Sequence, residues 1–318
     1  MENFSLQLCL IITFIMSIIA LIICLTTQMK CYISPRKLKS YIERILNRMI
    51  FPARSCNQYQ SISNQELKFF SVVRRNAGEG NQNQRCNNIE FNRIVPYAFL
   101  RNETYPNSKY YVIYFHGNGE NIDGAAQFVR LLMQSLKFHA FLIEYPKYGT
   151  YQYTETNAQI ILEDSILAYE QIKEENKLED SQIYIFGRSI GSGPAIHVAS
   201  QKNCRGLVTI SAYRSLKQLI RGMVFCVGYF VSQIMDERFN NEENITKVKC
   251  PALFIHGVDD TLIPSHHSIF LQRKLYNQTK AARQELFSHM NHNNIHEFQY
   301  EISEKIALYF EELSQANS

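Results

Sequence analysis

The chain has 318 residues, of which 46% are hydrophobic and 19% are charged, and its net charge is +4. This composition excludes a disordered chain and allows one large domain with a substantial core. The eight cysteines are scattered and form no C-x-x-C pair, so we expect buried or free thiols, no metal and no cofactor. No basic run is interleaved with aromatic residues, which argues against a nucleic-acid partner.

Residues 4–27 contain no charged side chain and are dense in Ile and Leu. About 20 apolar residues can cross a bilayer, so this run is predicted to be a transmembrane anchor. A cleaved signal peptide is the alternative, but basic residues before the run and a small-residue cleavage site after it are both missing. The bilayer is therefore an expected partner, whereas the sequence carries no signal for an oligomeric state.

A basic segment follows this apolar run, and it predicts the orientation of the chain in the membrane. Basic residues next to a span tend to stay in the cytosol, which predicts a cytosolic catalytic domain. Residues 30–48 are expected to lie along the membrane surface, with an ordinary solvated helix as the alternative. The basic residues are Lys30, Arg36, Lys37, Lys39, Arg44 and Arg48.

Residues 28–88 are interpreted as this basic juxtamembrane segment and a polar linker, and residues 89–313 as an α/β domain with a short cap at about 213–249. Short buried strands alternate there with helices, which predicts a mostly parallel sheet covered on both faces. The predicted strands are 110–115, 140–145, 183–186, 207–211, 252–255 and 284–287, and the predicted helices are 125–136, 158–176, 191–201, 267–275 and 295–312.

A G-x-S-x-G motif lies where the strand at 183–186 meets the following helix, with Ser189 at its centre. A nucleophilic serine needs a sharp turn that projects its hydroxyl from the sheet, and small neighbours let the backbone fold back. Ser189 is therefore the predicted nucleophile. The backbone N–H of Ile190, the next residue, is one predicted oxyanion donor.

The second donor is expected in the loop after the strand at 110–115, which reads His-Gly-Asn-Gly-Glu from residue 116. Its glycines let the backbone come close to a substrate. Asn118 is the favoured donor, with Gly119 as the alternative. We interpret His116 as structural.

A serine hydroxyl needs a base and an acid, and in folds with such an elbow the acid follows the serine in the chain and the histidine comes last. The acid is expected after the strand at 252–255, where Asp259 and Asp260 both occur; Asp260 is favoured, because Asp259 suits a turn-capping role. The base is expected after the strand at 284–287, where the fold allows both His289 and His292.

The combined motifs resemble the α/β-hydrolase superfamily over about residues 89–312, and in particular membrane-attached serine hydrolases related to protein depalmitoylases and serine-aminopeptidase-like domains. The matching segments are FHGNGENI at 115–122, YPKYG at 145–149, IYIFGRSIGSGPAIHVAS at 183–200, PALFIHGVDDTLIP at 251–264 and HNNI at 292–295. The resemblance implies an α/β-hydrolase fold and a triad of Ser189, Asp260 and His292, and so favours His292 over His289.

The resemblance also implies the reaction, which is cleavage of acyl thioesters or esters, with S-acylated proteins ranked first as substrates. Lysophospholipids or monoacylglycerols are the alternative, and a catalytically idle membrane-bound adaptor is the alternative from another class. The apolar stretch at 223–231 is a candidate wall for an acyl chain, or a helix packed on the core. Arg188, inside the motif, is expected to favour anionic substrates or to serve as a salt-bridge partner.

Overall fold

The computed structural model describes residues 35–52, 59–75, 89–153, 156–223, 229, 232 and 235–315. The predicted anchor at 4–27 lies outside these residues. Among the helices that are described, none has both the length and the apolar character needed to span a bilayer. Most of the apolar stretch at 223–231 also lies outside the described residues.

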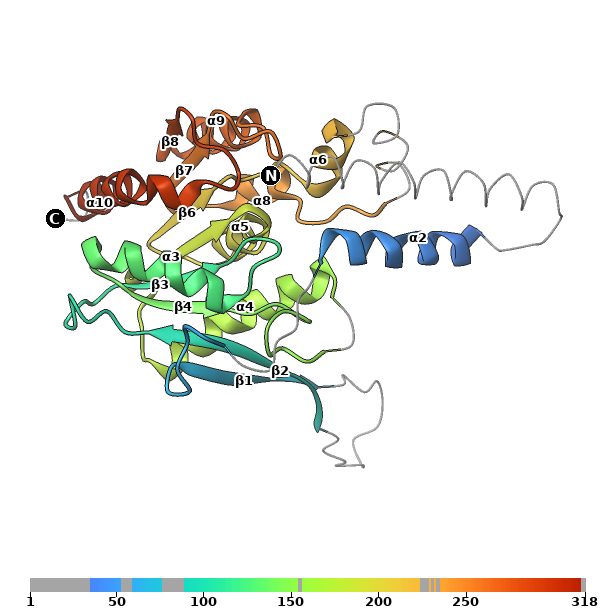
Figure 1. The fold of residues 1–318 in the computed structure, drawn as a ribbon, viewed down its shortest axis with the longest axis horizontal. Helices are drawn as coiled ribbons and strands as arrows, with labels where there is room; N and C mark the ends of the chain where they lie inside the picture. The colour runs from blue at the N-terminus through green and yellow to red at the C-terminus, as the bar shows by residue number, and fades with distance from the viewer. Residues whose placement is uncertain are drawn as a thin grey trace.

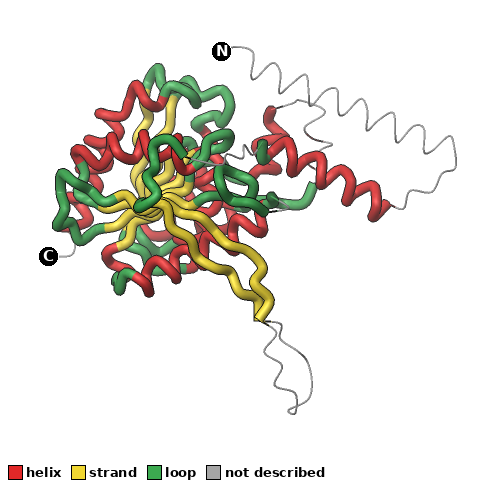
Figure 2. The backbone as a smooth tube through the Cα atoms, turned by 60° about the horizontal axis from the view of Figure 1, so that its bottom comes forward, coloured by secondary structure: helices red, strands yellow, loops and turns green. Residues whose placement is uncertain are grey.

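The described residues form one twisted eight-stranded sheet in the order β1-β2-β4-β3-β5-β6-β7-β8, seen as the central yellow ribbon in Figure 2. Strands β3 to β8 run parallel to one another, while β2 is antiparallel to both β1 and β4. The strands are β1 (Leu67–Arg75), β2 (Ile89–Leu100), β3 (Tyr111–Phe115), β4 (His139–Ile143), β5 (Ile183–Arg188), β6 (Gly206–Ile210), β7 (Ala252–Gly257) and β8 (Ala282–Phe287).

The middle of the sheet is hydrophobic along whole strands, because helices cover it on both sides. Strands β4, β6 and β7 are buried at every residue, as expected for parallel strands that have no solvent face. One core cluster lies under α3 and α10, and the other lies under α4, α5 and α9. Each of the strands and helices predicted after residue 89 is present within a few residues of its expected bounds.

The helices surround this sheet as Figure 1 shows. Asn121 caps the start of helix α3, where its side chain accepts from the Gly124 N–H, and Asn157 caps the start of α4 in the same way. The helices are α2 (Pro35–Ile50), α3 (Ile122–Ser135), α4 (Ala158–Glu175), α5 (Ser192–Gln201), α6 (Leu216–Met223), α8 (Asn241–Asn244), α9 (His266–Thr279) and α10 (Gln299–Gln315).

The sheet begins earlier than the sequence predicted, because β1 and β2 both precede the first predicted strand and β1 lies inside the segment interpreted as a polar linker. Its side chains alternate between the two faces of the sheet: Phe70 and Val72 are 5% exposed, whereas Phe69, on the opposite face, is 55% exposed. This period of two is typical of a half-buried strand. The interpretation of residues 54–88 as linker is therefore wrong at β1, which pairs with β2 at the edge of the sheet.

The basic segment forms α2, which contacts the predicted cap, while its position along a membrane surface stays a prediction. Lys39 pairs with Asp236 at 2.7 Å, Glu43 forms an ion pair with Arg238, and the ring of Phe51, just after α2, meets the ring of Phe239 edge to face at 6.1 Å. Helix α2 is thus joined to the fold close to α6, as Figure 1 shows. The described part of the predicted cap contains α6 and α8.

Candidate active site

Ser189 lies on a tight turn between β5 and α5, at the predicted strand-to-helix junction. Its φ of 52° is in the left-handed region, where a residue with a side chain is strained. A Cβ at Gly187 would collide with the Gly191 carbonyl, and a Cβ at Gly191 would collide with the Phe115 carbonyl at the end of β3. Both glycines are therefore required by close backbone contact, and the turn is pressed against β3.

The three residues predicted for the triad meet beyond the carboxyl ends of β5, β7 and β8. Ser189 Oγ lies 2.9 Å from His292 Nε2, and His292 Nδ1 lies 2.8 Å from Asp260 Oδ2. The other carboxylate oxygen of Asp260 accepts from the backbone N–H groups of Leu262, at 3.1 Å, and Ile263, at 2.8 Å. These bonds hold the carboxylate in one orientation, facing the imidazole.

The charge of Asp260 determines which nitrogen of His292 carries the proton. Burial acts to raise the pKa of Asp260, but hydrogen bonds from His256 and His292 outweigh it and hold that pKa well below its usual range. An ionised carboxylate only accepts hydrogen bonds, so the proton facing it lies on His292 Nδ1. His292 Nε2 is then free to accept the proton of the Ser189 hydroxyl, as a general base must.

The alternatives from the sequence, Asp259 and His289, form a separate pair at the surface. His289 Nδ1 lies 3.7 Å from Asp259 Oδ2, and these side chains are 90% and 56% exposed. The His292 side chain is only 11% exposed, and that of Asp260 is fully buried. The structure therefore brings Ser189 together with the favoured histidine and aspartate, and leaves the other two outside the cluster.

The loop after β3 is supported by a buried pair formed by His116 and Glu144. His116 Nε2 lies 3.0 Å from Glu144 Oε1, and both side chains are fully buried. Burial would lower the pKa of His116, but the neighbouring carboxylate outweighs burial and raises it. The Tyr145 ring stacks on His116 at 4.0 Å, and the Tyr145 hydroxyl donates to the His116 carbonyl at 2.9 Å. The ring of His116 thus points into the protein, which agrees with a structural role.

Asn118, the favoured second oxyanion donor, is held through its side chain by two distant segments. Its amide nitrogen donates to the carbonyl of Ile50 at the end of α2, at 2.7 Å, and its amide oxygen accepts from the Tyr148 hydroxyl, at 2.5 Å. On the other side, the Tyr213 hydroxyl donates to the Ile190 carbonyl at 3.2 Å. The segments that carry Asn118 and Ile190 are in contact, but their action as an oxyanion hole stays a prediction.

Arg188 is an ion-pair partner that joins three segments of the site. Its guanidinium lies 3.2 Å from Glu120 Oε1 and donates to the His292 carbonyl at 3.4 Å. Glu120 in turn accepts from the Gly117 N–H at 2.6 Å. The sequence motif left the role of Arg188 open and did not single out Glu120. Two features of the sequence could have indicated this ion pair: Glu120 lies three residues after Gly117, and Arg188 directly precedes Ser189.

The chain is similar to known serine hydrolases. The sequence model of the family described as "Serine hydrolase (FSH1)" matches residues 142–296. Protein bem46 of Schizosaccharomyces pombe is 27% identical over 197 residues, which cover 58% of this chain and 65% of that protein. The lysophosphatidylserine lipase ABHD12 of Danio rerio is 25% identical over 190 residues, covering 54% of this chain and 48% of that protein. The chain thus spans less than two thirds of either relative.

The fold also matches solved structures. An esterase of Pyrococcus furiosus superposes with a TM-score of 0.59 at 15% identity, covering 82% of this chain and 97% of that one. At such low identity the likeness concerns the fold alone. Together with the match of the serine hydrolase family model, it shows that the chain has an α/β-hydrolase fold and is similar to serine hydrolases of that superfamily.

Proposed function

We propose that this enzyme hydrolyses long-chain acyl esters or thioesters at a membrane, with Ser189 as nucleophile, His292 as general base and Asp260 as the residue that orients the base. The observation that carries the proposal is the chain of hydrogen bonds at 2.9 Å and 2.8 Å that joins these three side chains. It supports a base whose acceptor nitrogen faces the nucleophile and whose donor nitrogen faces a buried carboxylate.

The proposed reaction has two halves, and neither calls for a cofactor. Ser189 Oγ attacks the acyl carbon while its proton passes to His292 Nε2, and the oxyanion that forms is bound by the backbone N–H groups of Asn118 and Ile190. The leaving alcohol or thiol takes the proton from His292 as the acyl–oxygen or acyl–sulfur bond breaks. Water, deprotonated by the same histidine, then releases the fatty acid and regenerates the serine.

Two substrate classes fit this proposal, S-acylated proteins and lysophospholipids or monoacylglycerols. The first rests on the resemblance of the motif segments to those of depalmitoylases. The second is supported by the similarity to a lysophosphatidylserine lipase. Both present a long acyl chain on a polar carrier next to a membrane, so one measurement of chain-length preference tests what they share.

Acyl chain length is expected to dominate the specificity. Esters of C14–C16 acids should have a kcat/KM about a hundredfold or more above that of C2–C4 esters, because each buried CH₂ group contributes about 0.8 kcal/mol. The measurement is a series of esters with one leaving group, assayed with purified protein in detergent and corrected for the rate of Ser189→Ala. A preference for the short chains would remove the long-chain proposal. An acylated cysteine peptide compared with a lysophospholipid of equal chain length then separates the two classes.

We also propose that residues 4–27 anchor the enzyme in a single membrane pass, with the catalytic domain in the cytosol. The support is the length of the apolar run and the basic residues that follow it. An anchor would keep the active site beside substrates held in the same bilayer, which raises their effective concentration.

The orientation of the domain can be measured in sealed membranes. Protease added from the cytosolic side is expected to digest the hydrolase domain, because the basic flank at 30–48 retains it there. Membranes opened with detergent provide the control for protease access. Full protection of the domain in sealed membranes, or a glycan on Asn244, would show that the domain lies on the opposite side.

A further inference from the structure

Asn118, the proposed second oxyanion donor, lies between two glycines that offer no side chain to hold the loop. Gly119 has a φ of 77°, in the region that favours glycine. A Cβ at Gly119 would meet no atom within 4 Å, so the backbone on that side is open. On the other side, the Gly117 N–H is held by Glu120 at 2.6 Å. The position of the Asn118 peptide therefore depends strongly on what its own side chain contacts.

Both polar atoms of the Asn118 side chain are bonded to groups outside this loop. Its Nδ2 donates to the Ile50 carbonyl at 2.7 Å, and its Oδ1 accepts from the Tyr148 hydroxyl at 2.5 Å. Burial holds the pKa of Tyr148 above its ordinary value, so the hydroxyl keeps its proton and donates. An amide whose oxygen and nitrogen each have a directional partner is held in one orientation.

The Ile50 carbonyl is suited to this contact because it lies at the end of α2. Carbonyls in the last turn of a helix have no partner inside the helix, and this one is satisfied by Asn118. Helix α2 is in turn joined to the predicted cap. Glu43 pairs with the Arg238 guanidinium and accepts from the Asp236 backbone N–H at 2.8 Å.

The same part of the cap rests on the helix that follows the nucleophile. The ring of Phe51, directly after α2, meets the ring of Phe239 edge to face. A Cβ at Gly193 would lie 2.6 Å from the Phe239 ring, so this ring packs closely on the first turn of α5, four residues after Ser189. The end of α2 therefore has a defined place relative to the nucleophile.

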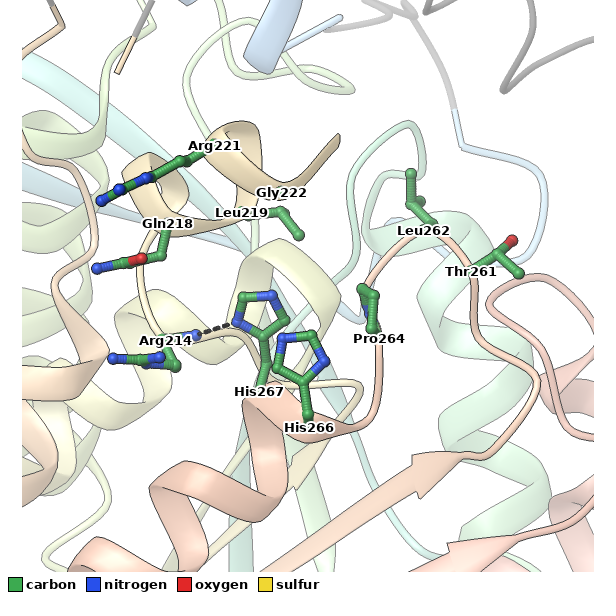
Figure 3. Close-up of a pocket in the computed structure, with 10 residues that line it drawn as sticks. All are labelled: Arg214, Gln218, Leu219, Arg221, Gly222, Thr261, Leu262, Pro264, His266 and His267. Atoms are coloured by element: carbon green, nitrogen blue, oxygen red, sulfur yellow. Dashed lines mark hydrogen bonds between the residues drawn. The ribbon is translucent and has the colours of Figure 1, made fainter. Parts of the chain in front are cut away.

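The pocket beside the loop of the acid is built without α2. It has a volume of about 290 Å³ and lies between α6, the residues after Asp260 and the start of α9. Figure 3 shows the His266 and His267 rings side by side in it, with the Arg214 backbone N–H bonded to His267. None of the described residues that line it belongs to α2. A group bound there would not contact α2, so we expect α2 to affect the chemical step and not the binding of substrate.

We infer that α2 is a positioning element of the active site: the Ile50 carbonyl, together with the Tyr148 hydroxyl, holds the Asn118 side chain and so directs the Asn118 backbone N–H at the oxyanion. A donor that is already in place needs no reorganisation when charge develops, and a loose donor loses this advantage. The site then extends beyond the predicted domain at 89–313, into the segment that follows the predicted anchor. The inference rests on the proposed function, because it specifies further residues for that reaction.

The variants Asn118→Ala and Tyr148→Phe test the positioning by steady-state kinetics. Asn118→Ala keeps the backbone N–H but removes both contacts, and should lower kcat about tenfold to a hundredfold while KM changes less than about threefold. Tyr148→Phe removes one contact and should lower kcat about tenfold. Tyr309→Phe is the matched control, because this buried hydroxyl donates to the Pro251 carbonyl, before the start of β7 and away from the triad. Unchanged kcat in Asn118→Ala, or equal losses in the two tyrosine variants, would overturn the inference.

A double-mutant cycle tests whether the effect of α2 passes through Asn118. Phe51→Ala loosens the end of α2 and should lower kcat about fivefold or more in the unaltered background, but by less than about twofold in Asn118→Ala, where the contact is already lost. Additive losses, or an unchanged kcat in Phe51→Ala alone, would overturn the role of α2. Glu43→Gln loosens the same helix without opening a core cavity, and replaces Phe51→Ala if the melting temperature shows that the latter does not fold.

A tetrahedral inhibitor separates positioning from stability. Ser189 Oγ adds to the carbonyl carbon of a long-chain trifluoromethyl ketone, its proton passes to His292, and the carbonyl oxygen becomes the oxyanion. Asn118→Ala and Tyr148→Phe should weaken this inhibitor in proportion to their loss of kcat, while the affinity for the methyl ketone of equal chain length holds. Equal weakening of both ketones would overturn the inference. Failure of the proposed function is recognised separately, as the absence of Ser189-dependent ester hydrolysis by the unaltered protein.

Discussion

Replacing Ser189 with Ala is expected to lower kcat for ester hydrolysis by about 10⁴- to 10⁶-fold and to abolish labelling by a fluorophosphonate probe. The reason is that no other hydroxyl is placed to replace it: Ser189 Oγ alone lies at 2.9 Å from His292 Nε2 among the described residues. The measurements are steady-state kinetics with a long-chain ester and gel fluorescence after treatment with the probe.

A serine in α5, the helix that follows Ser189, provides the control for this variant. Ser200 lies in α5, where its hydroxyl donates to the His197 carbonyl of its own helix. Ser200→Ala should therefore keep both labelling and kcat, while the melting temperatures of the two variants show that each is folded. Labelling of Ser189→Ala at the level of the unchanged protein would remove Ser189 as the nucleophile.

The second large effect is expected at the base, where two histidines three residues apart should behave in opposite ways. His292→Ala should lower kcat by about 10⁴-fold or more, because the serine then has no acceptor for its proton. His289→Ala should change kcat by less than about threefold, since its side chain is 90% exposed and pairs only with Asp259. The two variants remove the same side chain from the same loop, so each is the control for the other.

Kinetics at saturating substrate separate this prediction from an effect on binding. If His289→Ala lost activity while His292→Ala retained it, the base would be the surface histidine and the loop would have to rearrange before reaction. A comparable loss in both variants, with unchanged melting temperatures, would contradict a single general base at this position. Loss confined to His292→Ala, with KM little changed, is the outcome that the hydrogen-bond geometry predicts.

The local sequence carries the information for the elbow and for the alternation of strands and helices. Gly187 and Gly191 are needed because backbone atoms approach where a Cβ would be, and this requirement involves residues of the same motif and the end of one strand. Buried parallel strands can also be recognised locally, because a strand that is covered on both faces is hydrophobic at nearly every residue. The elbow and the alternation of strands and helices were therefore predictable.

Other parts of the site depend on contacts between residues far apart in the chain. The basic character of α2 could be recognised in the sequence, but its contact with the site could not. That contact is the hydrogen bond from Asn118 to the Ile50 carbonyl, which joins residues 68 positions apart. Likewise Arg188 could be recognised within its motif, but Glu120 and the His292 carbonyl reach it only through the folded sheet. The strand β1 was missed because it is half exposed and is stabilised by pairing with β2.

From the sequence by itself, the candidate base was predicted in the loop after β8 and the candidate acid in the loop after β7. Only the tertiary structure decides which histidine faces the serine, and the reason is the path of that loop. His289 has a φ of 65°, Met290 after it is 1% exposed, and a Cβ at Gly257 would collide with the Met290 carbonyl. Contact between the two loops therefore turns His289 to the solvent and His292 inward, and such contact is not encoded in either loop alone.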